Sequence, residues 1–178
     1  MPITRREFVK GSAACAALFP LALESADADP IKTGFLGVAH SHAAEKVKII
    51  RNSPDFVLRG VYAENDELAR AYAEVPRLAE KLVLQECDLV IVESAVRDHF
   101  KFAKMALEAG KHVHVEKPPA LTLSEMETLV RLARKQKRLV QVGYMWRYNP
   151  GLVKALEAAR EGWLGKVFMV RATINCRA

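Results

Sequence analysis

The stretch Ala106-Leu-Glu-Ala-Gly-Lys-His-Val-His-Val-Glu-Lys-Pro118 decides the fold of this chain, because a helix ends in it and a short strand follows. Gly110 is a typical residue just after a helix, and the run 112–116 predicts a strand. Glu116 and Lys117 then stand at the strand's carboxyl end, where ligands bind in an open α/β sheet. A lysine paired with a glutamate there is a candidate proton carrier, since the pKa of a buried or paired ammonium is easily shifted. The alternative is an ordinary surface salt bridge.

Strands and helices alternate on both sides of this stretch. We predict strands at 31–37, 56–62, 88–92, 112–116 and 139–142. Helices are predicted at 41–51, at 66–79, before Gly110, and after a capping box formed by Thr122 and Glu125. The apolar run 88–92 is typical of a strand buried on both faces of a parallel sheet. This alternation predicts a doubly wound α/β fold with right-handed crossovers.

The organisation changes after Gly143. An aromatic and polar connector, 144–150, leads to a helix with an apolar side that Gly162 ends, and the segment from Trp163 predicts the start of a strand. A lone strand cannot satisfy its own edges. We therefore expect 30–148 to form one domain and 149–178 to be the connector helix and first strand of a second, truncated domain.

The amino-terminal residues have the pattern of an export signal. Arg5 and Arg6 are followed by an uncharged, alanine-rich run, 11–23, and then by Ala26-Asp27-Ala28. This order predicts a twin-arginine signal over 1–28, and export of the folded protein to the periplasm by the twin-arginine machinery. The alternative is the basic start of a core helix. The apolar run is short for a bilayer span, so no stable membrane anchor is expected.

The formal net charge of +6 does not indicate a nucleic-acid partner. The densest basic cluster, 131–138, lies at the end of a predicted helix, where cations complement the carbonyl end of the dipole. No aromatic residues are interleaved with it, which favours a solvated helix face.

Period-two alternation brings His112, His114 and Glu116 to one face of their strand, which could be half of a metal site. No further ligand cluster is visible in the sequence. We therefore interpret these side chains as packing residues and expect no metal.

The turn after the first strand would hold a dinucleotide's pyrophosphate in a nucleotide-binding sheet. It contains Gly37, Val38, Ala39 and His40, and the glycine fingerprint would place glycines at 37, 39 and 42. Only Gly37 fits. His40 and His42 could donate to a phosphate near the helix N-terminus, or they could be capping or half-exposed imidazoles.

Glu64 follows the second strand, where an acidic residue binds the adenosine ribose in dinucleotide-binding folds. No arginine follows to receive a 2′-phosphate, which favours NAD without excluding NADP. The alternative is a solvated loop carboxylate.

Several motifs in order give the chain a resemblance to a known family. They are Ser94-Ala95 with His99 five residues on, Ala-Leu-Glu-Ala-Gly-Lys-His-Val at 106–113, Glu116-Lys117-Pro118, Gln-Val-Gly-Tyr at 141–144, Arg147-Tyr148-Asn149-Pro150, and Gly162 followed by Gly165-Lys166-Val167. Together they resemble the Gfo/Idh/MocA family of oxidoreductases, named for glucose-fructose oxidoreductase and inositol dehydrogenase. The resemblance covers 31–178.

The resemblance implies a Rossmann domain that binds NAD(P), followed by an α/β domain whose open sheet covers the nicotinamide and often forms homo-oligomers. It places catalytic Lys117 beside the nicotinamide and the substrate hydroxyl, and Glu116 at the ribose. Ser94, Ala95 and His99 would line the cofactor crevice, and Arg147 and Tyr148 would return toward the nicotinamide. The family's catalytic Asp and His would lie beyond Ala178.

The resemblance also implies the reaction. We expect an exported nicotinamide-dependent oxidoreductase that acts on a sugar, polyol or related hydroxyl compound. The alternatives are an NAD-dependent glycosidase of the same family, which regenerates its cofactor in each cycle, and a non-catalytic nucleotide-binding fragment.

Overall fold

The structure is a computed structural model that describes residues 29–173. The predicted export signal, 1–28, and the last five residues, 174–178, lie outside the described residues. All described helices and strands belong to the unit that begins at Ile31. None of these helices is long and apolar enough to cross a membrane.

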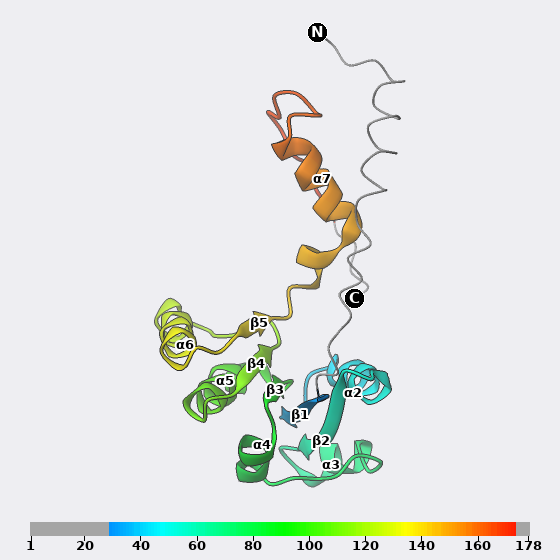
Figure 1. The fold of residues 1–178 in the computed structure, drawn as a ribbon, viewed down its shortest axis with the longest axis vertical. Helices are drawn as coiled ribbons and strands as arrows, with labels where there is room; N and C mark the ends of the chain where they lie inside the picture. Colours follow the sequence, from blue (N-terminus) through cyan, green and yellow to red (C-terminus); the bar gives the residue numbers. More distant parts are fainter. Residues whose placement is uncertain (1–28, 174–178) are drawn as a thin grey trace. The chain divides into compact units, whose positions relative to one another are not determined.

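A five-stranded parallel sheet forms the centre of the fold, with the strand order β2-β1-β3-β4-β5 (Figure 1). The strands are β1 (Ile31–Leu36), β2 (Phe56–Tyr62), β3 (Leu89–Val92), β4 (His112–Val115) and β5 (Val140–Val142). The helices between them are α2 (Ala43–Asn52), α3 (Asp66–Ala71), α4 (Glu80–Glu86), α5 (His99–Glu108) and α6 (Leu123–Gln136). The predicted doubly wound α/β fold is confirmed, and its strand order reverses between β1 and β3.

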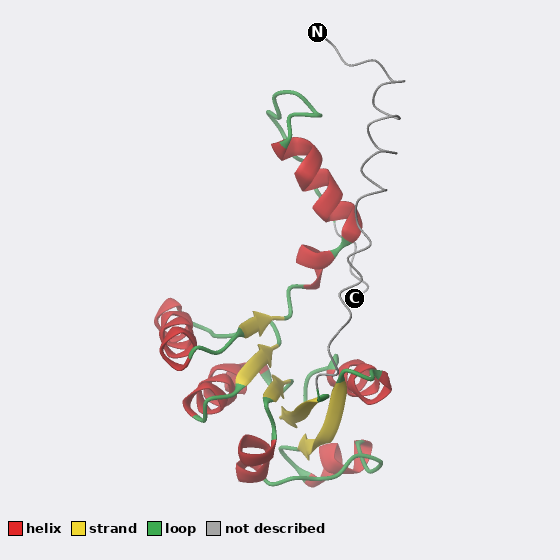
Figure 2. Ribbon diagram, viewed as in Figure 1, coloured by secondary structure: helices red, strands yellow, loops and turns green. Residues whose placement is uncertain are grey.

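Helices cover both faces of the sheet, as Figure 2 shows. Successive side chains of one strand point to opposite faces, so Phe35 and Leu36 of β1 enter two different cores. Leu36 packs in a cluster that includes Leu107 of α5 and Leu129 of α6. Phe35 packs in a cluster that includes Val47 of α2. Both faces of β1 are therefore buried, which fixes the turn that follows it.

Local sequence signals correctly predicted the end of α5 and the start of α6. Thr122 and Glu125 form the predicted capping box of α6, since each side chain accepts from the other residue's backbone N–H. Gly110 adopts a φ of +72° just after α5, a conformation that suits glycine. The other predicted strand and helix bounds in the sheet domain agree with the structure within two residues, except in the segment after β2.

The helix predicted over 66–79 is wrong beyond Ala71. Helix α3 ends there, and the chain turns back so that the N–H of Val61 donates to Pro76 O at 2.9 Å. Pro76 cannot continue a helix interior, because its ring removes a backbone donor and clashes with the preceding turn. A separate helix, α4, then begins at Glu80 and supplies Val83 to the core.

The connector and its helix form as predicted, but the strand after them does not. A short 3₁₀ helix, η2 (Met145–Tyr148), precedes α7 (Pro150–Arg160), whose first turn is capped by Asn149. The strand predicted from Trp163 is wrong for the described residues, because 163–173 contain no strand. A strand exists only when a neighbour pairs with its backbone groups, and the described part of the chain offers this segment no such neighbour.

Candidate functional site

The turn between β1 and α2 passes very close to residues that follow β2 and β3. Gly37 has a φ of +84°, in the left-handed region. A Cβ added to Gly37 would lie 2.4 Å from the Cβ of Ser94 and 2.7 Å from Oε1 of Glu64. This position therefore has room only for glycine, and it joins the ends of β1, β2 and β3 at one point.

Glu64 reaches across this turn instead of pointing into solvent. Its Oε2 accepts the backbone N–H of Val38 at 3.0 Å. Its Oε1 is buried and has no hydrogen-bond partner among the described residues. A buried oxygen without a partner is costly, so Glu64 presents an acceptor for a hydroxyl of a ligand placed over the turn. Ala39 is exposed beside it.

His99 ties two loops together. It is fully buried at the start of α5, and its ring nitrogens lie 2.8 Å from Pro118 O and 3.0 Å from Ser94 O. Ser94 is itself buried, and its hydroxyl donates to Ala95 O at 3.1 Å. His99 therefore positions the loops after β3 and β4, whereas the resemblance implied that it would line the crevice.

A buried ion cluster lies at the carboxyl ends of β3 and β4. Lys46 of α2 forms an ion pair with Glu93, and its Nζ lies 2.6 Å from Oε2 of Glu116 and 2.8 Å from Nε2 of His114. The two glutamates are 0% and 1% exposed. Lys46 thus supplies one cation for both carboxylates.

The sequence interpretation missed Lys46 and Glu93. Glu93 directly follows the apolar strand β3, so its place at a ligand-binding strand end could have been noticed. Lys46 stands next to Val47, a buried residue of α2, but the sequence does not show which carboxylates its side chain contacts.

The two carboxylates differ in proton affinity. Burial would raise the pKa of Glu116, but hydrogen bonds from Lys46 and Lys117 outweigh it and hold that pKa well below its usual range. Burial raises the pKa of Glu93, and the hydrogen bond from Lys46 only partly opposes this shift. Glu116 is therefore a stable anion, and Glu93 is the group that accepts a proton more readily.

Lys117 makes the predicted salt bridge and is also open to solvent. Its Nζ lies 3.0 Å from Oε1 of Glu116, and its side chain is 40% exposed. The salt bridge and the proton-carrier interpretation are compatible, because the ammonium is fixed by Glu116 at the strand end yet remains accessible to a ligand.

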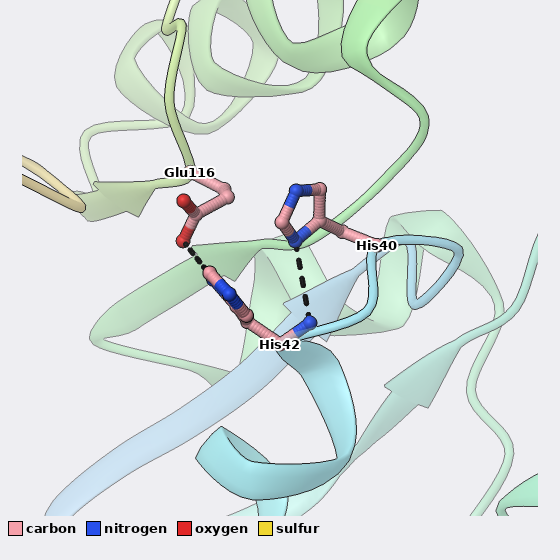
Figure 3. A group of neighbouring side chains, drawn as sticks. All are labelled: His40, His42 and Glu116. Carbon is pink, nitrogen blue, oxygen red and sulfur yellow. Dashed lines mark hydrogen bonds and ion pairs between the residues drawn. The ribbon is translucent and has the colours of Figure 1, made fainter. Parts of the chain in front are cut away.

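Figure 3 shows His42 directed at Glu116, with His40 beside it. Nδ1 of His42 lies 3.4 Å from Oε2 of Glu116, and Nδ1 of His40 lies 3.6 Å from Oε2 of Glu93. Nδ1 of His40 also accepts the backbone N–H of His42 at 3.3 Å. Burial lowers the pKa of His40, which favours its neutral form. His42 makes no side-chain cap to α2.

A cleft of about 480 Å³ opens beside this cluster. Its walls include Lys46, His114, Glu116 and, after β5, Gly143 and Tyr148. A Cβ on Gly143 would lie 2.7 Å from Oε2 of Glu116, so this glycine lets the loop pass close to the carboxylate.

The structure gathers most of the predicted site residues at one edge of the sheet. Arg147 is exposed and lines a separate hollow that Tyr148 shares with it. The crevice at the point where the strand order reverses is the usual ligand position in open α/β sheets.

Comparison with known proteins identifies the family. Residues 31–144 match the model of the Gfo/Idh/MocA oxidoreductases, described as an oxidoreductase family with an NAD-binding Rossmann fold. The chain belongs to the Gfo/Idh/MocA family. The predicted cofactor, NAD, is therefore confirmed at the level of this family.

Family members of known activity include sugar and polyol dehydrogenases. UDP-N-acetylglucosamine 3-dehydrogenase of Acidithiobacillus ferrooxidans is 30% identical over 129 residues, which cover 68% of this chain and 39% of that protein. An inositol 2-dehydrogenase/D-chiro-inositol 3-dehydrogenase of Halalkalibacterium halodurans is 40% identical over 85 residues, which cover 47% of this chain and 24% of that protein.

A solved structure supports the same assignment. A putative oxidoreductase from Yersinia pestis aligns with a TM-score of 0.65 and 29% identity, over 78% of this chain and 41% of that one. This Gfo/Idh/MocA chain spans about two fifths of the length of that relative and of the A. ferrooxidans enzyme.

Proposed function

We propose that the chain is the cofactor-binding part of an exported, nicotinamide-dependent oxidoreductase that acts on a sugar, polyol or related hydroxyl compound. The observation that carries this proposal is the Gly37 turn, where a cradle that admits no Cβ lies next to the buried, unpartnered Oε1 of Glu64. A dinucleotide would place its pyrophosphate against that turn at the start of α2, and a ribose hydroxyl would donate to Glu64.

We propose that Lys117 acts at the other end of the cofactor. Nicotinamide, when bound, accepts the hydride from the substrate carbon. The hydroxyl proton of the substrate must leave as the carbonyl forms. Lys117 is fixed by Glu116 at 3.0 Å, is 40% exposed, and would orient that hydroxyl and carry its proton away.

Export is part of the proposal and rests on residues 1–28. The paired arginines, the apolar run and the Ala26-Asp27-Ala28 site are the features of a twin-arginine signal. Export in the folded state would let the protein take up its cofactor in the cytoplasm. Replacing Arg5 and Arg6 together with lysine should keep the protein out of the periplasmic fraction. Equal periplasmic amounts of parent and variant would refute the export proposal.

The activity is tested with NAD⁺ and a panel of polyols, sugars and glycosides. An oxidoreductase forms NADH, seen as absorbance at 340 nm, and Lys117→Met should lower its rate while leaving NAD⁺ affinity nearly unchanged. Release of reducing sugar from a glycoside without net NADH would support the glycosidase alternative instead. NAD⁺ binding without turnover of any of these compounds would make this chain a nucleotide-binding module. We also propose, from the resemblance alone, that the protein forms a homo-oligomer.

A further inference from the structure

Two groups of potential metal ligands share Glu116. Glu93, His114 and Glu116 form one group, and their ligating atoms all lie within 4.8 Å of one another. The ammonium of Lys46 contacts all three of these residues, so this group already holds a cation. His40, His42 and Glu116 form the second group within the same 4.8 Å limit.

The spacing in the second group matches that of ligands around one ion. Ligand atoms about 2.1 Å from a tetrahedral metal stand roughly 3.4 Å from each other. Nδ1 of His42 and Oε2 of Glu116 are 3.4 Å apart, and Figure 3 shows the His42 ring directed at this carboxylate. The 3.6 Å between Nδ1 of His40 and Oε2 of Glu93 is nearly the same. Glu93 lies outside this group of three, so its Oε2 would have to move toward the other ligand atoms to become a fourth ligand.

A buried, unsatisfied oxygen points to a ligand. Glu93 is 0% exposed, and its Oε2 has no hydrogen-bond partner among the described residues. Nδ1 of His40 lies 3.6 Å from this oxygen, and it accepts the N–H of His42 and so carries a lone pair. Two acceptors that face each other across 3.6 Å leave a position that a cation would satisfy.

Charge sets the expected strength of binding. Glu93 and Glu116 bring two carboxylates to the site, and the ammonium groups of Lys46 and Lys117 balance both charges. The N-terminus of α2 is close by and opposes a cation. Binding therefore rests on the imidazole lone pairs and on the unpartnered Oε2 of Glu93, so the affinity should be weaker than that of a structural zinc site.

We propose that His40, His42 and Glu116, with Glu93 as a fourth ligand, bind a divalent first-row transition-metal ion. Imidazole and carboxylate together suit Zn²⁺, Mn²⁺ or Fe²⁺, whereas Mg²⁺ and Ca²⁺ take oxygen ligands. Glu116 also pairs with Lys117, so the ion would lie next to the group that the proposed function assigns to the substrate hydroxyl. It would act there as a Lewis acid that polarises a hydroxyl or carbonyl oxygen.

The test is calorimetric titration of the chelator-treated chain with ZnCl₂, together with the absorption spectrum after CoCl₂ is added. We expect one ion per chain and visible Co²⁺ bands that show nitrogen and oxygen ligands. His42→Asn should weaken binding at least tenfold. His112→Asn is the matched control and should leave it unchanged, because His112 lies outside both groups.

No Zn²⁺ or Co²⁺ binding up to millimolar concentration would overturn the proposal, and so would equal affinity in the parent and in His42→Asn. Circular dichroism verifies that both variants are folded. The titration contains no nucleotide, so its outcome is independent of whether the chain binds NAD.

Discussion

Replacement of Lys46 by methionine removes the cation that two buried carboxylates share. Glu93 and Glu116 are at most 1% exposed, while the side chain of Lys46 is 21% exposed. Breaking a buried ion pair by removing one partner costs about 3–5 kcal/mol. Because Lys46 is partly solvated and Glu93 can take up a proton, we expect a loss near the lower limit, about 3 kcal/mol.

Urea unfolding followed by far-UV circular dichroism at pH 7.5 measures this loss. The matched control is Lys48→Met, because Lys48 is exposed on the same helix. We expect the control to change stability by less than about 0.5 kcal/mol. Adding Glu93→Gln to Lys46→Met should restore part of the stability, since it removes one uncompensated charge. Equal stability of Lys46→Met and Lys48→Met would show that the two buried carboxylates do not depend on Lys46.

The pH dependence of stability gives a second test, because the lowered pKa of Glu116 fixes the direction of the change. The folded-state pKa of Glu116 is lowered, so its contribution to stability is present above the unfolded value of about 4.3 and is lost as the pH falls further. Lys46→Met lacks the part of that contribution that comes from Lys46, while the part from Lys117 remains. The stability gap between parent and variant should therefore narrow when the pH falls below about 4.3.

Three further predictions concern the crevice and the core. Gly37→Ala places a Cβ 2.4 Å from Ser94 and should lower both the melting temperature and NAD⁺ affinity, whereas Gly110→Ala, with open space around its Cβ, should cost only backbone strain of about 1 kcal/mol. His99→Ala removes the side chain that contacts the carbonyl oxygens of Ser94 and Pro118, and it should lower the free energy of unfolding in urea by about 2 kcal/mol. An unchanged urea midpoint would contradict the positioning role of His99. Burial raises the pKa of the Cys87 thiol from 9.0 to about 11, so it should resist iodoacetamide at pH 8 in the folded chain and react in urea, as site-resolved mass spectrometry would show. The neutral, buried thiol of Cys87 contributes to stability below pH 9, and this contribution is lost as the pH rises toward 11. The Cys87→Ala variant should show no such loss of stability over this pH range.

Signals confined to a few neighbouring residues were enough to predict most of the sheet domain. The capping box at Thr122 and Glu125 and the glycine at 110 act within one helical turn, so the sequence shows them directly. The error over 66–79 has an equally local cause, because Pro76 interrupts the helical pattern and its carbonyl pairs with β2.

The ion cluster could not be predicted in the same way. Lys46 lies 47 residues from Glu93 and 70 from Glu116, and only the strand order brings them together. The two histidines of the first turn were recognised as candidates, but their direction depends on where those carboxylates stand. The sequence left open either a phosphate contact or capping and half-exposed imidazoles, and the structure places each ring beside a carboxylate.

The most direct test of the central claim is a calorimetric titration of the chain with NAD⁺ and, separately, with NADP⁺. We expect one NAD⁺ per chain, with affinity lowered by Gly37→Ala and weakened about tenfold by Glu64→Gln, which removes the charge that favours the ribose donor. Glu67→Gln, at an exposed carboxylate of α3, should bind as the parent does. Absence of binding of both dinucleotides at millimolar concentration by a folded parent chain would contradict the account.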